Sequence, residues 1–138
     1  MSTHVLVVAH GSRAPGTAEA HGALCARLAE QLPDVVVGPA FLEMSAPSIS
    51  DAVDAAVAAG AHTVVLVPHF LHAGNHTGRD LPAALAAARA RHPGVDLRLG
   101  QHLGADERIV AVLADRARAV LAETPGLAET PGLTDPPG

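Results

Sequence analysis

Three histidines lie within eight residues of one another in the segment VPHFLHAGNHTGRDLP, residues 67–82. His69, His72 and His76 are interrupted by proline and glycine, so they do not follow one clean helical face. Imidazole is a common metal ligand and accepts protons near neutral pH. His72 and His76 would chelate from a helix, but Gly74 between them disfavours a continuous helix there. The segment is therefore a metal site, a proton-transfer site or, since the chain has nine histidines, a reflection of composition.

Further ionisable side chains follow the other apolar runs, near the points where strands would end. They are His10, Arg13, Glu43, Arg79 and His102. Imidazoles combined with a carboxylate suit borderline divalent ions such as Co²⁺, Fe²⁺, Ni²⁺ or Zn²⁺. Simpler interpretations stand beside this one, because the segment HGSR fits a turn with a helix cap and a lone glutamate could cap a helix. Histidines in a loop could likewise be only solvated.

The elements that must position these residues are read from the apolar pattern. Four short apolar runs predict strands at residues 4–10, 34–43, 62–68 and 95–100, the last alternating like an edge strand. Alanine-rich or amphipathic segments predict helices at residues 14–33, 45–60, 79–92 and 105–123. Pro82 is compatible only with the first turn of its helix. Strict alternation predicts an α/β fold, an open four-stranded parallel sheet flanked by helices on both faces.

In such a sheet, ligands bind outside the carboxyl ends of the strands. The ionisable residues that follow three separate strands would meet at this edge, which favours a functional site over chance. His21, His62 and His92 fall elsewhere in the predicted fold, and we expect them to be solvated polar residues.

One domain at residues 1–120 accounts for all of these elements. The segment LAETPG at residues 121–126 is repeated at residues 127–132, and more proline and glycine follow. A proline- and glycine-rich repeat with little to bury predicts a disordered tail at residues 121–138.

Composition excludes several classes of function. The formal charge is −5 and the chain has no tryptophan or tyrosine, which argues against nucleic-acid binding. No apolar run approaches the roughly 20 residues that span a bilayer, so no membrane association is expected and a cytoplasmic location is predicted. Cys25 is the only cysteine, which excludes an internal disulfide. The HExxH, GxGxxG, GxxxxGK[ST] and GxSxG motifs are all absent.

Three segments, taken in order, carry a resemblance to a known family. LVVAHGSR, AFLEMSAPSI and VVLVPHFLHAGNHTGRDLP, which contains G-x-H-x-x-x-D at Gly74, His76 and Asp80, lie within residues 4–120. Together they resemble the short form of the class II sirohydrochlorin chelatases, the small cobalt- or iron-inserting lyases of the cobalamin and siroheme pathways. The resemblance implies a chelatase-like α/β domain that is about half of the two-domain enzymes and works as a homodimer.

The resemblance also implies roles for individual residues. His10 and His76 would be the catalytic pair that holds the metal and accepts pyrrole protons, with Glu43 in support of both. His72 is a weaker candidate ligand or metal relay, and His69 is expected to be only a neighbour. The carboxylates of the tetrapyrrole would be bound by Arg13, Ser12 and Arg79, because arginine pairs with carboxylates through two parallel hydrogen bonds.

No permanent cofactor is expected, since the divalent metal (Fe²⁺, Co²⁺ or, as a third candidate, Ni²⁺) is itself a substrate. Metal insertion requires a weakly held ion and the loss of two pyrrole N–H protons, and imidazole suits both tasks. Two alternatives remain open. One is a non-enzymatic divalent-metal-binding or delivery module that uses the same histidines, although such a site would usually add cysteine or more carboxylate near the loop. The other is a phosphate-ester enzyme with His10 and Arg13 around a phosphoryl group.

Overall fold

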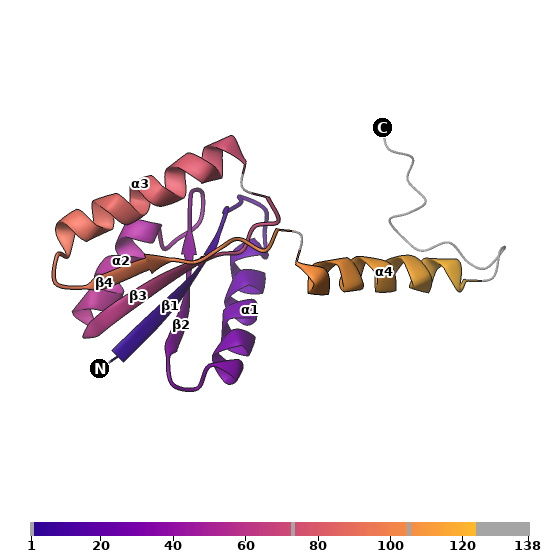
Figure 1. The fold of residues 1–138 in the computed structure, drawn as a ribbon, viewed down its shortest axis with the longest axis horizontal. Coiled ribbons are helices and arrows are strands. Elements are labelled where there is room, and N and C mark those ends of the chain that lie inside the picture. The colour runs from indigo at the N-terminus through magenta and orange to yellow at the C-terminus, as the bar shows by residue number, and fades with distance from the viewer. Residues whose placement is uncertain (1, 73, 105, 124–138) are drawn as a thin grey trace. The chain divides into compact units, whose positions relative to one another are not determined.

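Strands and helices alternate along the chain in the computed structural model, which describes residues 2–72, 74–104 and 106–123, without the side chains of residues 75–77. The elements follow one another as β1 (Ser2–Ala9), α1 (Thr17–Gln31), β2 (Val36–Phe41), α2 (Ile49–Ala58), β3 (Ala61–Pro68), α3 (Asn75–Arg91), β4 (Asp96–Leu99) and α4 (Glu107–Leu121) (Figure 1). Every predicted strand and helix is present. The largest differences, of four residues each, are that α2 begins at residue 49 rather than 45 and that α3 begins at residue 75 rather than 79.

The four strands form one parallel sheet in the order β2-β1-β3-β4. β1 is central, with Val5 opposite Val37 on one side and opposite Val65 on the other. β4 pairs only with β3 in this sheet, which confirms its prediction as an edge strand. Because all strands run the same way, the segments that follow β1, β2 and β3 leave the sheet at the same edge.

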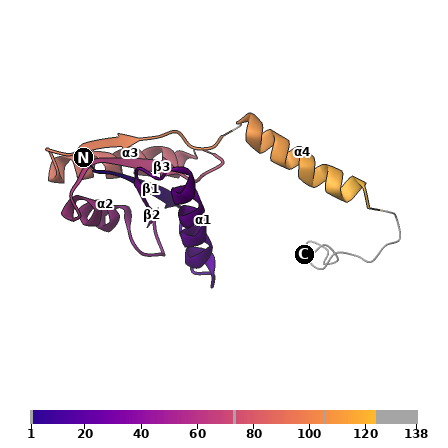
Figure 2. The same ribbon diagram turned by 90° about the horizontal axis from the view of Figure 1, so that it is seen from below.

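Helices cover both faces of the sheet and bury two separate clusters. The larger cluster lies under α2 and α3, which contribute Ala52, Val53, Ala56, Leu81, Leu85 and Ala88. The smaller cluster lies under α1, where Cys25 packs against Val5 and Val7. In both views α1 lies apart from α2 and α3 (Figures 1 and 2). The predicted class, an open four-stranded parallel sheet flanked by helices on both faces, is confirmed.

Pro82 lies inside α3 and not in its first turn, which corrects the sequence prediction. A proline in a helix interior removes one backbone hydrogen bond and crowds the preceding turn, at a cost of about 3 kcal/mol. Leu81 and Leu85 on either side of it are only 5% and 7% exposed, and Ala88 is fully buried one turn later. Burial of this helical face against the sheet outweighs the missing hydrogen bond.

The described residues fall into two compact units, one that ends at Gly104 and one that follows residue 105. The second unit contains α4, whose N-cap Asp106 accepts a hydrogen bond from the backbone N–H of Arg108. The Arg108 side chain also donates two hydrogen bonds to this carboxylate. These side-chain hydrogen bonds, and to a smaller extent the backbone hydrogen bond, hold the pKa of Asp106 well below its usual range. The division at residues 1–120 and 121–138 stays a prediction, since residues 124–138 lie outside the described residues.

No helix among the described residues is long and apolar enough to cross a membrane.

Candidate functional site

Two loops are tied to the carboxyl end of β1 by backbone hydrogen bonds. The N–H groups of Leu42 and Glu43, which follow β2, donate to the carbonyls of Ala9 and His10 at 3.0 and 3.1 Å. The N–H of His69, which follows β3, donates to the carbonyl of Val8 at 2.8 Å. The sheet pairing therefore continues beyond the strands. This edge, which we call the rim, brings together three of the segments that the sequence singled out.

His10 and Glu43 meet at the rim. His10 Nε2 lies 3.3 Å from Glu43 Oε1, and the two side chains are 51% and 43% exposed. The His10 ring also contacts Phe70 edge to face, with ring centroids 6.2 Å apart. The imidazole therefore has a carboxylate beside it and an aromatic wall next to it, yet both polar groups stay accessible to a ligand from solvent.

Gly11 allows this close approach of the two loops. Its φ is +99°, and a Cβ added there would lie 1.7 Å from the carbonyl oxygen of Glu43. Ser45 fastens the same two loops, because its hydroxyl accepts from the N–H of Ser12 at 3.2 Å and donates to the carbonyl of Ser12 at 3.1 Å. The His10–Glu43 pair is thus positioned by backbone geometry and by one serine.

Ser45 and Phe70 are site residues that the sequence pattern alone did not indicate. Each lies in a segment that could have suggested a role in the site. Ser45 lies beside Glu43, just before a proline, and Phe70 is one of only two phenylalanines in a chain without tryptophan or tyrosine. What the sequence could not provide was their distance from His10 and Ser12, which lie more than thirty residues away.

The remaining predicted residues are placed as follows. His76 belongs to the first turn of α3, whose N-cap is Gly74, and its side chain lies outside the described residues. Arg13 and Arg79 are exposed, and His72 precedes α3 and is exposed. The Ser12 hydroxyl accepts a hydrogen bond from the N–H of Ala14 at 3.0 Å.

In the part of the chain that is described, no three histidine, cysteine, aspartate or glutamate side chains are close enough together to hold a metal ion. Of the predicted metal set of His10, His76 and Glu43, the side chains of His10 and Glu43 are described, and they lie side by side. The metal-holding roles of the three residues stay a prediction.

His21 is buried, contrary to the expectation of a solvated residue. It is 5% exposed, and its Nε2 lies 2.8 Å from the carbonyl oxygen of Val7, so this nitrogen carries the proton that it donates. His69 stacks on it, with ring centroids 5.8 Å apart. Burial, and secondarily the charge of His21, lower the pKa of His69. The hydrogen bond to β1 explains how α1 accommodates a polar side chain against the sheet.

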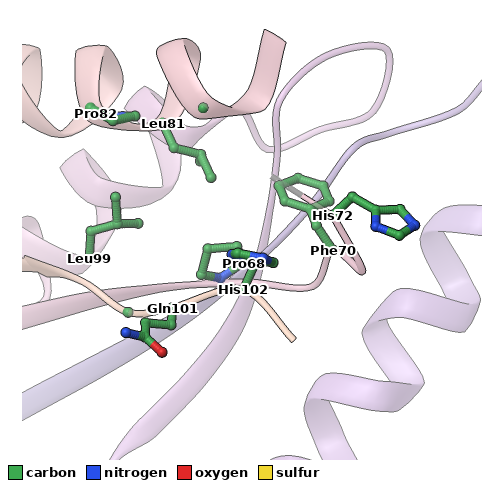
Figure 3. A pocket seen from close by; sticks show the side chains of 10 residues that line it. Pro68, Phe70, His72, Leu81, Pro82, Leu99, Gln101 and His102 are labelled. Carbon is green, nitrogen blue, oxygen red and sulfur yellow. The ribbon is translucent and has the colours of Figure 1, made fainter. Parts of the chain in front are cut away.

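A pocket of about 130 Å³ opens on the rim between α3 and the segment that follows β4. Its walls are mostly apolar, and Figure 3 shows Phe70, Leu81 and Leu99 around it. His102, one of the ionisable residues predicted to follow a strand, lines it together with His72 and Gln101.

Comparison with known proteins places the chain in a family. The CbiX family profile matches residues 4–120. The chain belongs to the CbiX family. The resemblance drawn from the three sequence segments is confirmed by this match and by the relatives that follow.

Several relatives of this chain are sirohydrochlorin chelatases. It is 31% identical over 132 residues to the sirohydrochlorin cobaltochelatase of Methanothermobacter thermautotrophicus, covering 85% of this chain and 92% of that one. It is 33% identical over 112 residues to the sirohydrochlorin ferrochelatase of Priestia megaterium, covering 81% of this chain. The chain spans only 42% of the length of that ferrochelatase.

A solved relative has the same fold. The sirohydrochlorin chelatase SirB from Bacillus subtilis subspecies spizizenii, in complex with cobalt, is 29% identical and superimposes with a TM-score of 0.76. The match covers 87% of this chain and 51% of that one.

Proposed function

We propose that this protein is a lyase that inserts Fe²⁺ or Co²⁺ into sirohydrochlorin. The named relatives, a cobaltochelatase and a ferrochelatase, support this substrate class. The observation that carries the proposal is the exposed His10–Glu43 pair, held at 3.3 Å on the rim. In an open parallel α/β sheet this edge is where ligands bind.

The separation of the pair suits one shared metal ion. Ligand nitrogen and oxygen atoms lie about 2.0–2.2 Å from a small divalent ion, so two neighbouring ligands of that ion are roughly 3–3.5 Å apart. His10 Nε2 and Glu43 Oε1 have that spacing. One imidazole and one carboxylate, without a thiolate, would hold Fe²⁺ or Co²⁺ weakly enough for release to a stronger tetradentate ligand.

His76 completes the proposed catalytic set. It belongs to the first turn of α3, and the family resemblance gives its imidazole the partner role to His10. The reaction exchanges two pyrrole N–H protons for one divalent ion. We assign the acceptance of these protons to His10 and His76, with Glu43 supporting the charge on the imidazole, and a further metal-relay role to His72.

Substrate contacts and assembly follow the same proposal. Arg13 and Arg79 are exposed cations that we assign, with Ser12, to the peripheral carboxylates of the tetrapyrrole. The metal is a substrate, and no permanent cofactor is assigned. We further propose a homodimer, which light scattering would show as twice the chain mass of 13.9 kDa.

The direct test is metal insertion itself. Under anaerobic conditions, Co²⁺ or Fe²⁺ is added to sirohydrochlorin with and without the protein, and the absorption spectrum is followed. We expect clear acceleration by the wild-type protein and a loss of about 10²-fold or more in His76→Ala, because a lost proton acceptor has effects of that size. Stoichiometric metal binding without turnover would instead establish a metal-delivery module.

A further inference from the structure

The rim pocket has an apolar body and a polar mouth. Its apolar walls come from the end of β3 and the loop after it, from α3 and from β4, namely Pro68, Phe70, Leu81, Pro82 and Leu99. Around them lie the polar side chains of His72, Gln101 and His102, and none of the described lining residues is an arginine or an acid. In Figure 3, the apolar side chains of Leu81, Leu99 and Phe70 surround the pocket from different elements.

Backbone contacts hold the walls of the pocket in place. The N–H of Gly100 donates to the carbonyl of Leu66 at 2.8 Å, and the N–H of Leu103 donates to the carbonyl of Phe70 at 2.9 Å. The His102 ring lies against Gly104, where an added Cβ would come within 3.3 Å of Nε2. Backbone hydrogen bonds therefore fix the segment that follows β4 against β3 and the loop after it, so the pocket exists without a ligand.

Phe70 connects this pocket to the catalytic histidine. It lines the pocket, and its ring contacts the His10 ring edge to face. A single aromatic side chain thus stands between the pocket and the proposed metal-holding imidazole. A macrocycle whose centre faces His10 is broad enough to extend its periphery past Phe70 and over the pocket.

We propose that this pocket is a subsite for one carboxyalkyl arm of the tetrapyrrole, an inference that rests on the proposed function. A volume of about 130 Å³ is far too small for the macrocycle. It admits a side chain of a few non-hydrogen atoms. A propionate arm has two methylenes and one carboxylate, which matches this size. The methylenes pack against Phe70 and Leu99, and the carboxylate accepts hydrogen bonds from His102 and Gln101 at the mouth.

The kind of donor in the described lining, imidazole and amide rather than guanidinium, gives the subsite a distinct role. Exposed arginines, such as Arg13 and Arg79, attract any carboxylate at the rim. An apolar pocket whose described donors are amide and imidazole groups instead accepts an arm of matching length, because a shorter or missing arm leaves apolar walls and polar groups unmatched. The subsite thus fixes the orientation of the macrocycle over His10.

Gly78 offers a way to fill the pocket. It lines the pocket from α3, and a Cβ added there meets no described atom within 4 Å. Titration of metal-free sirohydrochlorin into the protein, followed by absorption, measures substrate binding without turnover. We expect Gly78→Leu to weaken binding by roughly tenfold or more, whereas Gly78→Ala, its matched control, stays close to wild type. Co²⁺ binding without tetrapyrrole should be unchanged in both variants.

His102 provides an independent test that leaves α3 untouched. His102→Ala should weaken binding of metal-free sirohydrochlorin by roughly tenfold, the effect of removing a hydrogen bond to a carboxylate, and should raise KM more than it lowers kcat. His102→Gln restores a donor and should recover most of the affinity. Wild-type affinity in both His102→Ala and Gly78→Leu would overturn the subsite. Failure of the wild-type protein to bind sirohydrochlorin would overturn the proposed function itself.

Discussion

Two histidine–carboxylate pairs among the described residues lie at opposite ends of the sheet. His10 and Glu43 meet at the carboxyl end of the strands, 3.3 Å apart and about half exposed. His92 and Asp54 meet at the other end, where the chain leaves α3, with Nε2 and Oδ1 2.7 Å apart. His92 is only 20% exposed. An imidazole and a carboxylate therefore meet twice, once at a longer distance with an exposed histidine and once at a shorter distance with a mostly buried histidine.

The surroundings of the two carboxylates explain the difference. Arg91 also donates to Asp54 Oδ1, at 3.1 and 3.3 Å, so this carboxylate joins α2 to α3. The hydrogen bonds from His92 and then from Arg91 lower the pKa of Asp54. Among the described residues, no arginine pairs with Glu43. A carboxylate already shared by an imidazole and a guanidinium stabilises the fold, whereas one that shares a single imidazole at an open edge can still bind a metal ion.

The largest effect is expected where backbone geometry holds the rim pair. Gly11→Ala would place a Cβ 1.7 Å from the Glu43 carbonyl oxygen, so the two loops must separate. We expect the free energy of unfolding to fall by more than about 3 kcal/mol, together with loss of metal binding. Urea denaturation measures the first effect and Co²⁺ titration the second.

Gly16→Ala is the matched control for this substitution. Gly16 also has a positive φ, +84°, but an added Cβ meets no described atom within 4 Å. The free energy of unfolding of Gly16→Ala should fall by only roughly 1–2 kcal/mol, the cost of a left-handed backbone conformation at a residue with a Cβ, and metal binding should be retained. Equal losses in the two variants would show that Gly11 serves conformation alone and not the approach of the loops.

The fold and the rim could be predicted from the sequence, whereas contacts between distant residues could not. The alternation of strands and helices predicted the sheet, because the spacing of apolar residues is visible in each short segment. The polar residues that follow the strands predicted the rim, because parallel strands all end at the same side of the sheet. The interior position of Pro82 was missed, since burial of Leu81 and Leu85 by the sheet is not visible locally. His21 was missed for a similar reason, because its partner is the carbonyl of Val7 in another element. The Ser12–Ser45 contact likewise joins residues that only the folded chain brings together.

Removal of one charge from each carboxylate should separate their roles. Glu43→Gln is expected to lower the insertion rate by about tenfold or more while the urea midpoint stays near wild type, because the side chain is exposed and no longer binds metal as an anion. Asp54→Asn should lower the urea midpoint and leave the insertion rate unchanged. A rate loss in Asp54→Asn that matches that of Glu43→Gln would remove the distinction between the pairs.

The smallest expected effect concerns His69, which belongs to neither pair. Its pKa is lowered from the ordinary value of 6.5 by burial and by the charge of His21. The unfolded chain therefore takes up a proton at higher pH than the folded chain, and this contribution to stability is lost as the pH falls below about 6.5. In urea denaturation, His69→Phe should lose less stability than wild type between pH 7.5 and pH 5.5. Parallel pH curves for the two proteins would contradict this assignment.

The most direct test of the account compares the two histidines in one assay. The initial rate of Co²⁺ insertion into sirohydrochlorin is measured anaerobically for the wild type, His10→Ala and His92→Ala. We predict that His10→Ala loses at least about 10²-fold in rate with its fold intact, while His92→Ala is less stable but inserts metal at nearly the wild-type rate. Near-normal turnover in His10→Ala, or equal losses in both variants, would contradict the assignment of metal insertion to the rim.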